Sequence, residues 1–219
     1  MSIALSLANN LTTGGKFIAA AINNTSVSNV TSFASIPAGG VLRLLSTQTA
    51  SDSASISFTN DGSAGLTTYK EYIFSFINIH QAATSFASFD VGFRDGSTDY
   101  DAPKQTAKFE VYHTEADSTS LAYSGGDDLA NGTAFQRIGL SGYNNDESMS
   151  GFMRLFEPSS TTFTKHFIST TNAYYTGSNA SWQEHVGGYI NTTTAIDGVQ
   201  FKMSTGNIQS GVIKMYGVL

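Results

Sequence analysis

The chain has 219 residues, of which 13% are charged and 12% aromatic, with a formal net charge of −6 and no cysteine. Its 11 Lys and Arg residues are scattered, which disfavours nucleic acid as a partner because phosphate binding requires clustered positive charge. Without cysteine the chain has no disulfide, thiolate metal site or thiol nucleophile. No run approaches the roughly 20 apolar residues of a membrane helix, so no membrane partner is expected either.

Residues 1–40 are small and polar, and Asn-Asn and Gly-Gly pairs interrupt them repeatedly. Ile3, Leu5 and Leu7 alternate as a strand would. We interpret residues 1–40 as a strand followed by an extended arm, with a short helix over residues 16–22 as the alternative. We expect the apolar residues of this arm to contact a neighbouring subunit, namely Phe17, Ile18 and Ile22.

From residue 41 onward the strand signals become regular. Residues 41–47 and 54–59 are predicted to be neighbouring strands, and residues 69–79 form the strongest strand pattern in the chain. There, one face carries Tyr72, Phe74 and Phe76, and the other carries Ile73, Ile77 and Ile79. A strand that is apolar on both faces requires two covers, so we predict a subunit interface that includes Tyr69, Ile73 and Ile77.

The later strands follow the same period. In residues 108–113 the pattern predicts Phe109 and Val111 inward and Glu110 outward. Residues 148–157 and 163–170 are predicted to form a hairpin, and residues 195–219 are predicted to form another, with Ile213, Met215 and Leu219 on its buried side. About ten to twelve short strands between turn signals predict an all-β fold, an antiparallel, jelly-roll-like β-sandwich over residues 41–219.

One loop suggests a metal site. Residues 93–103 bring Asp95, Asp99 and Asp101 close together in the sequence, and carboxylates at such spacing are ligands for Ca²⁺. The spacing differs from an EF-hand, and Asp is also a common turn residue. We favour a structural turn over a calcium site, and no cofactor is expected.

Nothing in the sequence predicts an enzyme. The four His residues form no HExxH or HxH motif, and no spacing sets Asp146, Glu147 or Glu157 opposite one another as a glycosidase pair. Four aromatic residues offer a sugar-stacking surface as an alternative to core packing, and core packing is favoured: Trp182, Tyr174, Tyr175 and Tyr189.

Three segments carry a family resemblance, namely TYKEYIFSFINIH (68–80), PSSTTFTKHFISTTNAYY (158–175) and TTAIDGVQFKMSTGNIQSGVIKMYGVL (193–219). They resemble virion structural proteins of marine tailed phages, such as cyanophages and Pelagibacter phages, over about residues 40–219. The resemblance implies a non-enzymatic component of the virion. We expect a homotrimeric decoration (cement) protein on the capsid surface that binds the major capsid protein. A receptor-binding tail-fibre domain and a carbohydrate-binding domain are the alternatives.

Overall fold

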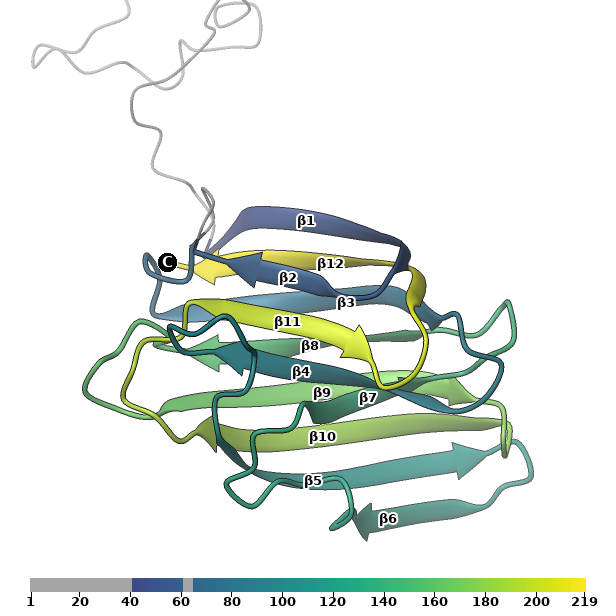
Figure 1. Ribbon diagram of the computed structural model, residues 1–219. Coiled ribbons are helices and arrows are strands. Elements are labelled where there is room, and N and C mark those ends of the chain that lie inside the picture. The colour runs from purple at the N-terminus through teal and green to yellow at the C-terminus, as the bar shows by residue number, and fades with distance from the viewer. Residues whose placement is uncertain (1–40, 61–64) are drawn as a thin grey trace, which may run out of the picture. The chain divides into compact units, whose positions relative to one another are not determined.

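The computed structural model describes residues 41–60 and 65–219, and this part of the chain contains twelve strands and no helix. Accordingly, no described segment is a helix that is long and apolar enough to cross a membrane. Two antiparallel sheets lie face to face (Figure 1), which confirms the predicted all-β sandwich. The strand order does not establish a jelly roll. The predicted arm over residues 1–40 lies outside the described residues, so its boundary stays a prediction.

The larger sheet has eight strands in the order β1-β12-β3-β8-β9-β10-β5-β6. In chain order these strands are β1 (Leu42–Ser53), β3 (Glu71–Gln81), β5 (Lys104–Thr114), β6 (Thr119–Tyr123), β8 (Met149–Phe156), β9 (Lys165–Tyr175), β10 (Ala180–Ile190) and β12 (Ile208–Val218). The predicted hairpin is confirmed, because β8 and β9 pair antiparallel.

The smaller sheet has four strands in the order β2-β11-β4-β7 and covers part of one face of the larger sheet (Figure 1). Its strands are β2 (Ile56–Thr59), β4 (Ala87–Arg94), β7 (Gln136–Ser141) and β11 (Gly198–Met203). We call the opposite side of the larger sheet, which faces away from the smaller one, the outer sheet face.

Two predicted strand pairings are wrong. The strands β1 and β2 were expected to be neighbours, and β11 and β12 were expected to form a hairpin, but each pair is divided between the two sheets. The strand β11 pairs with β2 and β4, whereas β12 pairs with β1 and β3. Both connections therefore cross from one layer to the other, and turn residues alone do not distinguish such a crossing from a hairpin.

A cluster of phenylalanine rings holds the two layers together. Phe201 of β11 lies at its centre, with ring centroids 5.4 Å from Phe74, 5.2 Å from Phe76, 5.7 Å from Phe89 and 6.3 Å from Phe58. All five side chains are buried. Each aromatic pair adds about 0.5–1.5 kcal/mol beyond its buried area, so this cluster fixes how the sheets stack.

A β-bulge changes the predicted faces of β3. Tyr72, Phe74 and Phe76 point into the core as predicted. The register then shifts between Phe76 and Ile79, and Asn78 adopts a positive φ of 49°. Ile79, which was expected on the outer face, is consequently turned into the core and is fully buried.

The predicted faces of β5 are reversed. Lys108 is fully buried, whereas Phe109 is 45% exposed on the outer sheet face. The buried ammonium group is stabilised by carboxylates, with Nζ 3.0 Å from Glu110 and 3.1 Å from Asp127. These ion pairs explain the reversal, because a buried charge is tolerated when it is paired.

The predicted burial of Leu219 at the end of the last strand is also wrong. Ile213 and Met215 of β12 are buried as predicted, but Leu219 is 63% exposed. It follows the end of β12, where its amide donates a hydrogen bond to the Val41 carbonyl. Its side chain therefore contributes little to the core.

Candidate functional site

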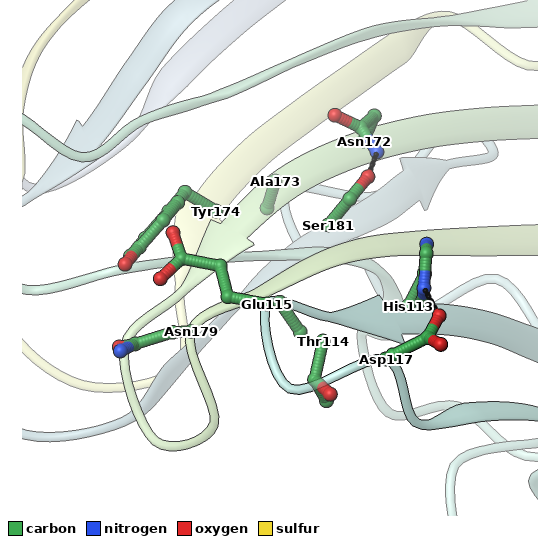
Figure 2. A pocket seen from close by; sticks show the side chains of 10 residues that line it. His113, Thr114, Glu115, Asp117, Asn172, Ala173, Tyr174, Asn179 and Ser181 are labelled. Carbon is green, nitrogen blue, oxygen red and sulfur yellow. Dashed lines mark hydrogen bonds and ion pairs between the residues drawn. The ribbon is translucent and has the colours of Figure 1, made fainter.

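A groove lies where β5, β9 and β10 meet at one end of the larger sheet (Figure 2). Register places Tyr174 of β9 and His113 of β5 on either side of Ser181 of β10. Neighbouring strands are about 4.8 Å apart, so the two larger side chains stand roughly 10 Å apart over a small one. The result is an open cavity of about 500 Å³ on the outer sheet face, which we call the strand-end groove.

Two tight turns form the rim of the strand-end groove. In the β5–β6 turn, Thr114 accepts a hydrogen bond from the Asp117 amide, and Asp117 has a φ of 62°. In the β9–β10 turn, Asn179 has a φ of 46°. The Glu115 amide donates to the Asn179 carbonyl at 2.9 Å, so the two turns are tied to each other. Asp and Asn tolerate positive φ better than most residues, which explains their presence here.

The strand-end groove is acidic. Partial burial and the carboxylates of Glu115, Glu147 and Asp146 raise the pKa of the Tyr174 phenol. Figure 2 shows the Glu115 carboxylate beside the Tyr174 ring. On the opposite side, His113 Nε2 lies 3.1 Å from an Asp117 carboxylate oxygen. The groove therefore combines one aromatic ring with hydrogen-bonding groups and a negative potential.

Asn172 adds a fixed amide to the strand-end groove. Its Nδ2 donates to Ser181 Oγ at 2.9 Å and to the Trp182 carbonyl at 3.4 Å. These bonds hold the amide plane in one orientation. In Figure 2 its carbonyl oxygen points away from Ser181, and this oxygen is an acceptor for further hydrogen bonds.

The outer sheet face is a second candidate surface. One row of its side chains runs across five strands, from Leu44 to Tyr216, Ile73, Arg154 and Ile168. The exposed large apolar residues on this face include Leu42, Leu44, Ile77, Phe109, Leu121, Tyr123, Phe152, Ile168 and Tyr174. Around Ile73, Phe152 and Tyr216 the face is hollowed by a cavity of about 640 Å³. Extensive exposed apolar surface of this kind is typical of an interaction surface.

The predicted interface residues divide between the core and this face. Ile73 is half-buried and Ile77 is 38% exposed, both on the outer sheet face. Tyr69 is only 9% exposed and packs edge-on against Tyr72 at 5.8 Å, so little of its ring is left to contact a partner. Its ring fills the space above a glycine of β12, Gly217, which explains its burial. Phe17, Ile18 and Ile22 lie outside the described residues.

The three aspartates of the acidic loop lie apart from one another. Among the described residues, no group of three His, Asp or Glu side chains is close enough to hold a metal ion, so Asp95, Asp99 and Asp101 do not converge. The Asp99 amide instead donates a hydrogen bond to Ser97 Oγ at 3.1 Å, within a local turn. Asp is common in such local turns, and the preference for a structural turn over a calcium site stays a prediction.

Two buried lysines explain how the charge of this loop is balanced. Lys104 Nζ donates to the Ala102 carbonyl at 2.7 Å, and Lys165 Nζ donates to the Thr192 and Thr194 carbonyls. Burial lowers the pKa of Lys104 to about 8, although Asp101 and Asp95 oppose the shift. An internal ammonium group thus supplies positive charge beside the aspartates that we considered, but did not favour, as ligands for Ca²⁺.

The four aromatic residues considered for sugar stacking do not share a platform. The Trp182 ring stacks on Tyr112 with a centroid distance of 4.8 Å, and the Tyr175 ring lies 5.1 Å from Trp182. Trp182 and Tyr175 both pack against the core. Tyr189 lies edge-on to His166 at 6.2 Å. Only Tyr174 lines the strand-end groove.

Two of the three acids considered for catalysis, Glu147 and Glu157, make structural contacts. The Glu147 carboxylate accepts hydrogen bonds from Asn144 and Thr176, and Glu157 pairs with Lys70 at 2.7 Å.

No sequence motif predicted the strand-end groove, because His113, Asn172 and Ser181 come from three strands and only the sheet register joins them. The chain is thus an antiparallel β-sandwich with two candidate binding surfaces.

No protein-family model matches the chain, and no curated protein matches it either.

Proposed function

We propose that this chain is a structural component of a phage virion that decorates the capsid as a homotrimer and binds the major capsid protein. The observation that carries the proposal is the exposed apolar outer sheet face. A sheet with one face against the core and apolar side chains on the other gains stability when a second protein covers that face.

Composition and resemblance support the same proposal. With only 13% charged residues, the chain is suited to assembly through apolar contacts rather than through many ion pairs. The three segments noted above resemble virion structural proteins of marine tailed phages. Such proteins occupy repeated sites, where a small symmetric oligomer binds several neighbouring subunits at once.

Quantitative mass spectrometry of purified virions tests this function. A decorating protein is present in copy numbers comparable to the major capsid protein and remains with heads after tails are removed. Far fewer copies, confined to tail fractions, would reject capsid decoration and support a tail-fibre component instead.

A further inference from the structure

We propose that the strand-end groove binds a neutral saccharide unit of a glycan. Its volume of about 500 Å³ lies within the range of small-ligand sites and accommodates one or two sugar rings. The floor at Ser181 is small, while Tyr174 and His113 stand on either side of it. The groove is therefore deep enough to hold a ring and open enough for the rest of a glycan chain to leave it.

The lining matches the two kinds of surface that a sugar presents. A pyranose has an apolar face of C–H groups, and Tyr174, 39% exposed, offers an aromatic face to pack against it. A pyranose also has a rim of hydroxyl groups that donate and accept hydrogen bonds. The Glu115 carboxylate accepts hydrogen bonds, while the amide groups of Asn172 and Asn179 line the same groove (Figure 2).

The charge of the strand-end groove selects among saccharides. Glu115 and Asp117 belong to its lining, and the carboxylates of Asp146 and Glu147 act on Tyr174 from nearby. Opposing these acids within the groove there is one titratable base, His113, which lies beside Asp117. Sialylated or sulfated sugars are repelled by such a surface, so the ligand class is a neutral hexose or N-acetylhexosamine.

The groove is also organised before binding. The bond between the Glu115 amide and the Asn179 carbonyl fixes one turn against the other, and Ser181 fixes the Asn172 amide. Binding then requires little ordering of side chains, which favours affinity for a small ligand.

Saturation-transfer NMR on the full chain tests the inference with the methyl glycosides of glucose, galactose, mannose and N-acetylglucosamine. At least one of these sugars gives a transfer signal with the wild-type protein. Tyr174→Ala weakens its binding about tenfold or more, because the stacking surface is lost. Tyr143→Ala is the matched control, since Tyr143 is 38% exposed and does not line the groove, and it binds as the wild type does.

A second variant keeps the test valid if Tyr174→Ala alters folding. Ser181 is exposed on the outer sheet face, so Ser181→Leu fills the groove without disturbing the core, and it abolishes binding while leaving the melting temperature unchanged. The inference is overturned if none of the neutral glycosides binds, if Ser181→Leu folds and still binds, or if 3′-sialyllactose binds as tightly as the neutral sugars. These measurements use purified protein and do not depend on a location in the virion.

Discussion

Arg137 of β7 and Glu184 of β10 form an ion pair that joins the smaller sheet to the larger one, with Arg137 Nε 3.2 Å from Glu184 Oε2. Glu184 is 1% exposed, and burial raises the pKa of its carboxyl although Arg137 and Lys108 oppose the shift. Lys108 Nζ lies 3.6 Å from the same carboxylate. The two cations together allow a carboxylate to remain inside the sandwich.

We predict that Arg137→Met destabilises the fold by about 3 kcal/mol, because a buried carboxylate loses its closer partner. Urea denaturation measures the change in the free energy of unfolding. Lys70→Met is the control, since its ion pair with Glu157 is exposed and contributes less than about 1 kcal/mol. Equal effects of the two substitutions would contradict a role for the Arg137 pair in joining the sheets.

Asp90 makes stability depend on pH. It is 8% exposed on β4, and burial raises the pKa of its carboxyl from 3.8 to about 6, against the opposing effects of Ser88, Arg137 and Lys202. The folded protein therefore binds this proton more tightly than the unfolded chain does. The contribution of Asp90 is most favourable below pH 3.8 and is lost as the pH rises through about 6.

Asp90→Asn should consequently stabilise the protein at pH 7 and have little effect near pH 4. At about 1.4 kcal/mol per pKa unit, the gain at neutral pH is roughly 2–3 kcal/mol. The difference in melting temperature between variant and wild type, followed across this pH range, provides the measurement. A difference that is the same at every pH would show that the Asp90 carboxyl does not titrate in this window.

Gly187 offers a probe of the outer sheet face. It lies opposite Ile168 in the apolar row, and a Cβ at this position would meet nothing within 4 Å. Gly187→Glu should therefore fold normally. In the proposed homotrimer it should prevent self-association, because it places a charge in the surface that a second copy would cover. Sedimentation velocity measures the oligomeric state.

Gly126→Glu is the matched control for that substitution. Gly126 also leaves open space for a Cβ, but it lies in the turn after β6 rather than in the apolar row. It should leave assembly unchanged. If the wild type is a monomer, or if both variants assemble alike, the outer sheet face is not the self-association surface.

Calcium should have no measurable effect on stability. The ammonium groups of Lys104 and Lys165 already lie beside the acidic loop, and Asp95 acts on both of them. We expect the same melting temperature with calcium and with a chelator. A substantial decrease with the chelator, abolished in the double variant Asp99→Ala and Asp101→Ala, would reveal a calcium site that needs the ion to form.

The sequence was sufficient for the fold class because alternating apolar residues mark the side of a strand that faces the core. Phe89, Val91 and Phe93 alternate and are all fully buried. Alternation failed in β5, where a paired charge at Lys108 replaces an apolar side chain inside the sandwich. It also failed at Ile79, because a bulge adds a residue that no local pattern predicts.

The strand-end groove was beyond sequence reasoning for a different reason. His113, Asn172 and Ser181 each look like ordinary polar strand residues in isolation. They become a site through the registers of β5, β9 and β10, which depend on pairings between distant segments. The aromatic candidates show that closeness in sequence does not imply a shared site. Tyr174 and Tyr175 are adjacent in the chain but lie on opposite sides of the sheet.

Because β12 lies between β1 and β3, the larger sheet cannot close until the last strand of the described chain has been synthesised. The strands β1 and β3 do not pair with each other directly. They are joined only when residues 208–218 have left the ribosome and inserted between them as β12. During synthesis the chain thus carries unpaired strand edges beside apolar side chains, and contacts this distant in sequence form slowly. We expect nascent chains that have not yet reached residue 208 to bind chaperones, and release to coincide with closure of the larger sheet.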